Sequence, residues 1–167
     1  QLLDGNQMPT ETNVNITFAN SLTGAPMYDF VHFLDRQGKP DTVQIDPVVE
    51  YDLIVNTVPA VIKRNVAIVI GKHNVISIPA SQGNLLIKQE GRRDNNLQSI
   101  IREKGNVEII HTQQSNLPFR YLTGKYTVET LTLPRRTFEA DIQPNKTQTI
   151  LLPAPGVVNF NTIATGY

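Results

Sequence analysis

Residues 126–134 read YTVETLTLP and residues 51–59 read YDLIVNTVP; in both stretches apolar and polar side chains largely alternate before a proline. Alternation with a period of two predicts a β-strand with one buried face. Proline cannot donate a hydrogen bond to a neighbouring strand, so each predicted strand ends, or lies at a sheet edge, at its proline. The recurrence of a tyrosine, a strand and a Thr-x-Pro sequence in both halves indicates an internal duplication.

Further matched pairs combine a strand with a turn and support the same duplication. They are residues 71–80 (GKHNVISIPA) with 143–154 (QPNKTQTILLPA), residues 82–87 with 155–160, and residues 33–39 with 100–106. Strands and the turns that set their register are the parts that a duplicated fold preserves.

We therefore predict an all-β fold of two tandem antiparallel β-sandwich modules of the Ig-like or prealbumin-like kind, with about seven strands each. The predicted modules are residues 1–91 and 92–167, and the polar segment 89–96 is the predicted linker between them. Modules of this size have thin cores, so we expect the halves to bury apolar surface against each other or against a neighbouring part of the protein that is missing from this sequence. Residues 94–103 also fit a helix, but the duplication favours a strand there.

Three segments carry a resemblance to a known class of module. These are residues 34–39 (LDRQGK), residues 124–129 (GKYTVE) and residues 144–152 (PNKTQTILL). In these segments the chain resembles prealbumin-like or carboxypeptidase-regulatory-like β-sandwich modules. It is also similar to the tandem modules appended to von Willebrand factor A domains in envelope proteins of Gram-negative bacteria. The resemblance implies a scaffold or binding role in the cell envelope, the periplasm or the extracellular space of a bacterium.

Composition excludes several classes of site. The chain has 15 Lys and Arg, 15 Asp and Glu, no cysteine and three histidines. Balanced charge gives no general attraction to nucleic acid, and without cysteine there is no disulfide and no thiolate metal site. No apolar run approaches the roughly 20 residues that a membrane-spanning helix needs. Because the chain starts at Gln1, we expect a processed product or a piece of a longer protein.

Motifs for catalysis are also missing. The sequence has no nucleophile elbow, phosphate-binding loop, dinucleotide fingerprint or zinc-protease motif. His32 and His111 fall in predicted strands and His73 at a predicted hairpin tip, so we interpret none of them as a ligand or catalyst. We accordingly predict no catalytic, cofactor-binding or metal-binding residues and no cofactor.

Two groups of charged residues are considered as binding surfaces. Asp35, Asp41, Asp46 and Glu50 could form an acidic edge for a cation such as calcium, although a solvated edge strand is the favoured interpretation. The basic cluster is interpreted as a solvated surface; it comprises Lys88, Arg92, Arg93, Arg102 and Lys104.

Aromatic rings could stack on sugars if they are exposed. The candidates are Tyr28, Phe30 and Phe33 in the first half, and Phe119 and Tyr121 in the second. Tyr51 and Tyr126 are instead predicted to lie in the two cores.

The preferred function is a non-catalytic accessory or interaction module pair of a larger secreted or cell-envelope protein. A carbohydrate-binding module is the alternative, and a carboxylate-dependent hydrolase ranks third. Expected partners are a protein or a glycan, together with further domains of the parent chain, and neither nucleic acid nor membrane insertion is expected. The segments 41–50 and 60–70 differ most between the copies, so recognition is expected there.

Overall fold

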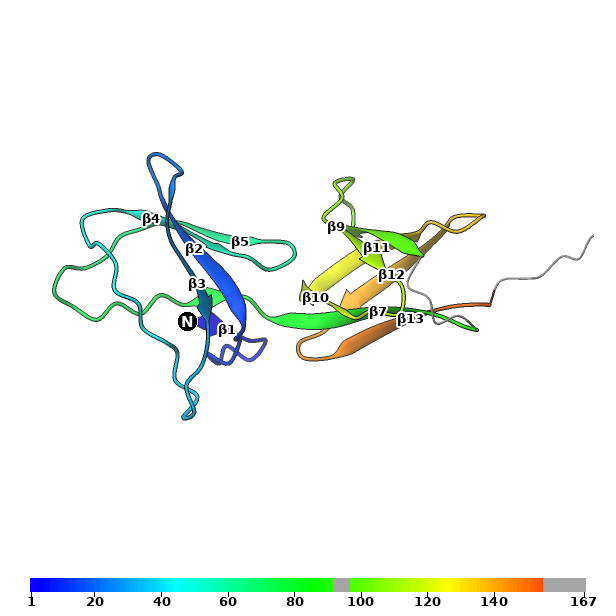
Figure 1. Cartoon of the computed structure of the whole chain (residues 1–167), viewed down its shortest axis with the longest axis horizontal. Helices are drawn as coiled ribbons and strands as arrows, with labels where there is room; N and C mark the ends of the chain where they lie inside the picture. Colours follow the sequence, from blue (N-terminus) through cyan, green and yellow to red (C-terminus); the bar gives the residue numbers. More distant parts are fainter. Residues whose placement is uncertain (92–96, 155–167) are drawn as a thin grey trace, which may run out of the picture.

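A computed structural model describes residues 1–91 and 97–154 of the chain, and all of its regular secondary structure in these ranges is β-strand (Figure 1). The strands of the first half are β1 (Leu2–Leu3), β2 (Val14–Asn20), β3 (Pro26–His32), β4 (Tyr51–Val55), β5 (Val61–Val66) and β6 (Ile78–Pro79). The remaining strands are β7 (Gln82–Gln89), β8 (Gln98–Glu103), β9 (His111–Gln114), β10 (Phe119–Leu122), β11 (Gly124–Thr130), β12 (Arg136–Ile142) and β13 (Thr147–Leu152).

Strands β1 to β6 form the first of two units, which we call unit 1. Four of them make an antiparallel sheet in the order β3-β2-β4-β5, and β1 pairs in parallel with β6. Their alternating side chains bury one face of the larger sheet in a core of its own. The buried core side chains are Leu2, Val14, Ile16, Phe18, Tyr51, Leu53, Val55, Ile78 and Ala80.

Strands β7 to β13 form the second unit, unit 2. Its larger sheet has the order β12-β11-β8-β9, and its smaller sheet has the order β10-β7-β13. A second, separate core lies within it: Leu85, Ile87, Ile101, Tyr121, Tyr126, Val128, Ala140, Ile142, Ile150 and Leu152. Each unit therefore has its own hydrophobic core.

The two units pair their strands in the same way. Order β3-β2-β4-β5 in unit 1 matches order β9-β8-β11-β12 in unit 2, and the parallel pair β1-β6 matches the parallel pair β7-β13. Strand β10 has no counterpart in unit 1, so unit 1 has six strands and unit 2 has seven among the described residues. The expected count of about seven strands in each module is not confirmed.

Strand β7 hydrogen-bonds with strands of unit 2 only. Gln82–Gln89 pairs antiparallel with β10 and parallel with β13. This differs from the division at 91/92, which assigns these residues to the first module. The repeat pattern aligns this strand with residues 155–160 but does not say whether it closes one copy or opens the next, because both choices follow the same Pro-Ala pair.

The match of residues 33–39 with residues 100–106 was wrong, and the choice between helix and strand after the predicted linker is resolved. Residues 100–103 belong to β8, the counterpart of β2, whereas residues 33–39 form a turn after β3. These segments share a sequence pattern but not a place in the fold. The strand favoured for the ambiguous segment is confirmed over Gln98–Glu103, and residues 92–96 of the predicted linker lie outside the described residues.

The two Thr-x-Pro sequences form the same loop in both units. Thr57 Oγ1 donates to the carbonyl of Pro59 at 2.6 Å, and Thr132 Oγ1 donates to the carbonyl of Pro134 at 2.7 Å. Each proline follows a cis peptide bond, at Val58-Pro59 and Leu133-Pro134. We call residues 56–60 the Val58 loop and residues 131–135 the Leu133 loop.

The tyrosines at the matched positions lie in the cores, as the sequence predicted. Tyr51 is fully buried and Tyr126 is 2% exposed. The hydroxyl of Tyr51 donates to the carbonyl of Asp46, and that of Tyr126 donates to the carbonyl of Leu122, each at 2.7 Å. Each ring thus fills a core while its hydroxyl fixes the segment that enters the strand.

Burial of these phenol groups predicts a loss of folding stability at alkaline pH. Burial raises the pKa of Tyr126 from 10.0 to about 12, and the carboxylate of Glu103 adds to the shift. Since the unfolded chain loses this proton first, the contribution of Tyr126 to the free energy of unfolding should be constant below pH 10 and fall between pH 10 and 12. Tyr126→Phe should cost about 1 kcal/mol at pH 7 through the lost hydrogen bond, and should flatten the alkaline fall. Urea denaturation across this pH range measures both effects, and equal slopes for the two proteins would contradict the assignment.

Candidate functional site: a cleft in unit 1 and the junction between units

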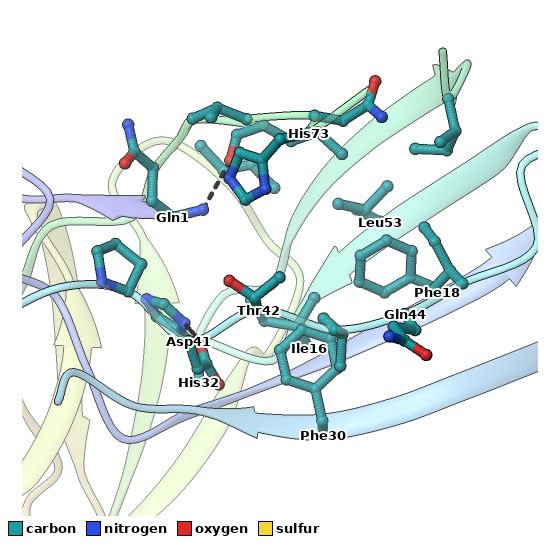
Figure 2. A pocket seen from close by; sticks show the side chains of 18 of the residues that line it. Gln1, Ile16, Phe18, Phe30, His32, Asp41, Thr42, Gln44, Leu53 and His73 are labelled. Carbon is teal, nitrogen blue, oxygen red and sulfur yellow. Dashed lines mark hydrogen bonds and ion pairs between the residues drawn. The ribbon is translucent and has the colours of Figure 1, made fainter. Parts of the chain in front are cut away.

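A cleft of about 780 Å³ opens on the inner face of the larger sheet of unit 1. Its floor consists of apolar side chains of β2, β3 and β4, namely Ile16, Phe18, Phe30 and Leu53 (Figure 2). In unit 2 the corresponding space is covered by a three-stranded sheet, whereas unit 1 has only the short β1-β6 pair there. The cleft is therefore the part of the unit 1 sandwich that its smaller sheet leaves open.

One end of the cleft is polar. His32 is 2% exposed at the end of β3, and its Nδ1 is hydrogen-bonded to Oδ1 of Asp41 (Figure 2). The other ring nitrogen, Nε2, is buried without a hydrogen-bond partner. His32 was predicted to lie in a strand, either packed or facing solvent; it ends β3 with a buried side chain that also lines the cleft.

Two segments of unit 1 form the rim of this cleft. Residues 39–45 line one side and residues 68–69 and 71–76 line the other. The Asn74 side chain accepts from Val69 N and donates to the carbonyls of Val69 and Lys72, which holds the second rim in shape. The structure thus brings together parts of the two segments in which recognition was expected, although Val61–Val66 within 60–70 is a strand and not a loop.

The acidic residues near this rim are each engaged locally. Asp35 Oδ1 accepts from the amides of Gln37 and Lys39, and Asp46 Oδ1 accepts from the amide of Val48. Asp41 pairs with His32. Within residues 1–91 and 97–154, no group of three or more His, Asp or Glu side chains is placed to hold a metal ion.

The candidate sugar-stacking rings do not form an exposed platform in the described structure. Tyr121 is fully buried, and Phe119 stacks on His111 with their ring centroids 4.0 Å apart. Phe33 is 52% exposed, while Tyr28 and Phe30 pack against the unit 1 core.

Two members of the basic cluster form ion pairs within unit 2. Arg102 Nη1 lies 2.9 Å from Oε2 of Glu129, and Lys104 Nζ lies 2.8 Å from Oε1 of Glu139. Arg92 and Arg93 lie outside the described residues.

A buried ion pair joins the two units. The Glu11 side chain of unit 1 is 2% exposed, and its Oε2 lies 2.7 Å from Nη2 of Arg120 on β10. Its other oxygen, Oε1, accepts from the amide of Gln82, and Arg120 Nη1 donates to the carbonyl of Thr12. A carboxylate that is removed from water is stable only with such partners, so this pair fixes both units in one arrangement.

Backbone hydrogen bonds and one apolar contact complete the junction. Leu122 N donates to the carbonyl of Val58 at 2.8 Å, and Thr123 N donates to the carbonyl of Ser81 at 2.9 Å. The Val58 side chain packs against the unit 2 core. In Figure 1 the hairpin between β4 and β5, which carries the Val58 loop, points toward unit 2. The junction therefore combines the Val58 loop of unit 1 with β10 of unit 2.

Sequence reasoning did not find the junction. Glu11 and Arg120 are 109 residues apart, and nothing in their local sequence marks them as partners. The one usable signal was the Thr-x-Pro sequence, which locates the Val58 loop but not its contact. The described residues contain no helix of the length and apolar character that would cross a membrane.

Comparison with known proteins gives a limited result. No protein-family model matches the chain, and no curated protein matches its sequence. Solved structures that it is similar to include the TIE protein of Bacillus anthracis, with 14% identity and a TM-score of 0.37 over 91% of this chain and 32% of that one. Another is the minor pilin of the Gram-positive pathogen Streptococcus agalactiae, with 13% identity and a TM-score of 0.36 over 91% of this chain and 87% of that one. The chain thus spans 32% of the TIE protein chain.

Proposed function

We propose that this chain is a non-catalytic pair of β-sandwich modules that holds neighbouring parts of a larger secreted or cell-envelope protein in a fixed arrangement. The observation that carries the proposal is the junction, where a buried Glu11–Arg120 pair and two backbone hydrogen bonds lock unit 1 to unit 2. Modules joined by a free linker would not need such contacts. The envelope location rests on the sequence resemblance to prealbumin-like modules.

The connection between units also argues against a hinge. Only Ala80 and Ser81 separate β6 from β7. Ala80 is fully buried and its amide donates to the carbonyl of Leu3, while the carbonyl of Ser81 accepts from Thr123. Since both connecting residues are held by backbone hydrogen bonds, a change of direction there would break contacts on each side.

We also propose that the two units are copies of one module, residues 1–80 and 82–154. The equal order of strand pairing, the equal Thr-x-Pro loops and the equal tyrosine hydrogen bonds support a duplication. The cleft in unit 1, whose volume suits a small ligand or an inserted side chain, is the candidate surface for the interaction part of the role. Carbohydrate binding stays a prediction without a specific structural feature in its favour.

The fixed arrangement can be tested by measuring a distance across the junction. Leu22 in unit 1 and Val107 in unit 2 are 93% and 90% exposed, and the chain has no cysteine, so Leu22→Cys with Val107→Cys gives two defined label sites. Spin labels at these sites should give one narrow distance distribution by pulsed electron paramagnetic resonance. Insertion of Gly-Gly-Ser-Gly after Ser81 is the control and should broaden it. An equally broad distribution in the uninserted chain would overturn the proposed function.

A further inference from the structure

The Leu133 loop of unit 2 repeats the shape of the Val58 loop of unit 1 but has no contact of the same kind. Both loops follow the strand that contains the matched tyrosine, and in both the threonine hydroxyl donates to the proline carbonyl. The residue before the cis bond is Val58 in one and Leu133 in the other. Val58 packs on the core of the next unit, whereas Leu133 is 100% exposed.

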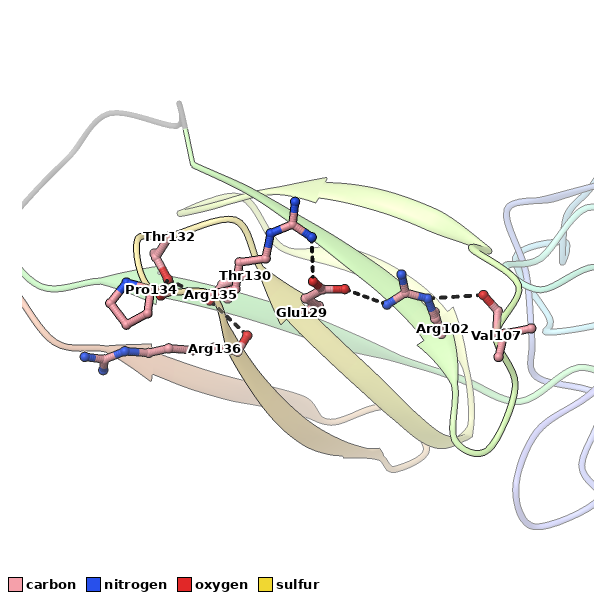
Figure 3. A network of polar contacts seen from close by, with 8 residues as sticks. All are labelled: Arg102, Val107, Glu129, Thr130, Thr132, Pro134, Arg135 and Arg136. Atoms are coloured by element: carbon pink, nitrogen blue, oxygen red, sulfur yellow. Dashed lines mark hydrogen bonds and ion pairs between the residues drawn. The ribbon is translucent and has the colours of Figure 1, made fainter.

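The Leu133 loop is held in a defined conformation. Arg135 Nη1 lies 2.9 Å from Oε1 of Glu129, and Thr130 Oγ1 donates to the carbonyl of Arg136 (Figure 3). Leu131 N donates to the carbonyl of Gln98, as Asn56 N donates to the carbonyl of Asn15 in unit 1. A fully exposed leucine at the tip of a fixed loop is a preformed apolar contact, because little further ordering is needed for it to bind.

The location of this loop and the sequence that follows agree with an interface. The loop between β11 and β12 lies at the end of unit 2 that is farthest from unit 1 (Figure 1). Residues 155–160 read PGVVNF and follow the same Pro-Ala pair that precedes residues 82–87, QGNLLI, at the start of unit 2. The two segments share one glycine, Gly83 in residues 82–87 and Gly156 in residues 155–160.

We propose that the Leu133 loop is the docking site for a third β-sandwich module of the same type. Leu133 then packs on the core of that module as Val58 packs on the core of unit 2, and its carbonyl accepts from the strand that corresponds to β10. The inference rests on the proposed function, since it extends the same locked junction to the next module. The occupant is a module of the unit 2 type because unit 1 lacks a counterpart of β10 and cannot offer the donor that Leu122 provides.

Cysteine protection tests this docking, with a copy of residues 82–154 appended directly after Ala154 as the probe module. Leu133→Cys is compared in the 167-residue chain and in the extended chain by its rate of reaction with a thiol reagent. The thiol should react rapidly in the 167-residue chain. In the extended chain its reaction should be slower by a factor of about ten or more. Leu22→Cys is the control that stays reactive in both, and Val58→Cys is the control that is protected in both.

The controls separate the two proposals. Rapid reaction of Val58→Cys would contradict the locked junction itself. Protection of Val58→Cys with rapid reaction of Leu133→Cys in the extended chain would overturn the docking site alone. An appended module that fails to fold would also contradict the docking, because the loop is expected to support it. Protection of Leu133→Cys in the 167-residue chain that rises with protein concentration would assign the site to a second copy and would equally overturn the proposal.

Discussion

Arg120→Ala should lower the free energy of unfolding by about 3 kcal/mol, because it leaves the Glu11 carboxylate buried without its cation. Glu11 is 2% exposed in its side chain, while Arg120 is 38% exposed, so the main loss is the solvation that the isolated carboxylate cannot regain. The amide of Gln82 would be the one remaining described donor to Glu11. Urea denaturation at neutral pH measures the effect.

A matched control separates burial from charge. Arg135 also pairs with a glutamate at 2.9 Å, but its own side chain is 66% exposed. Arg135→Ala should therefore cost less than about 1 kcal/mol, as exposed pairs do. Glu11→Gln combined with Arg120→Ala should recover part of the loss, since a neutral amide is easier to bury than an unpaired carboxylate. Equal costs for Arg120→Ala and Arg135→Ala would show that the junction pair is not structurally important.

The central strands of the larger sheets could be predicted because each buries one face. Residues 51–55 and 126–130 alternate with a period of two, and the strands β4 and β11 lie where the pattern places them. Their terminal prolines were equally informative, since a residue that cannot donate to a sheet marks a strand end. Local chemistry of this kind depends only on neighbours along the chain.

Pairing between distant segments could not be predicted in the same way. The pattern of β7 is compatible with either unit, and its partners β10 and β13 lie far from it along the chain. The cleft is a consequence of a strand that unit 1 does not have, and the residues that line it carry no common sequence signal. His32 was correctly predicted to lie in a strand, yet its contact with Asp41 depends on the path of residues 33–40.

The junction and the cleft lie at different parts of the unit 1 sandwich. Unit 1 can therefore hold unit 2 in place with one part and bind a partner with another. The Val58 loop and Glu11 are committed to unit 2, whereas the open inner face between residues 39–45 and 71–76 is not. A partner could therefore occupy the cleft without disturbing the contacts that set the direction of unit 2. Changes at Arg120 should alter stability and leave binding at the cleft intact, which gives the two roles separate readouts.

Gly83→Ala is expected to destabilise the protein by about 3 kcal/mol through steric overlap. Gly83 is buried near the start of β7, and an added Cβ would lie 2.2 Å from the carbonyl oxygen of Gln143 and 3.0 Å from that of Lys146. Both oxygens belong to the backbone of the β12–β13 turn, so the overlap cannot be relieved by rotating a side chain. The turn or β7 has to move, and Asn145 N would then lose its hydrogen bond to the carbonyl of Gln82.

Gly24→Ala is the matched control for this change, because it separates overlap from backbone conformation. Gly24 has a φ of +71° but has no atom within 4 Å of an added Cβ. It should cost about 1 kcal/mol, which is the strain of a left-handed residue in open space. Thermal and urea unfolding should show that Gly83→Ala has a much lower free energy of unfolding than Gly24→Ala. An equal or reversed order would mean that the β12–β13 turn moves to accommodate the methyl group. Close packing would then not explain the glycine at this position of the repeat, where the sequence has Gly156 after the second Pro-Ala pair.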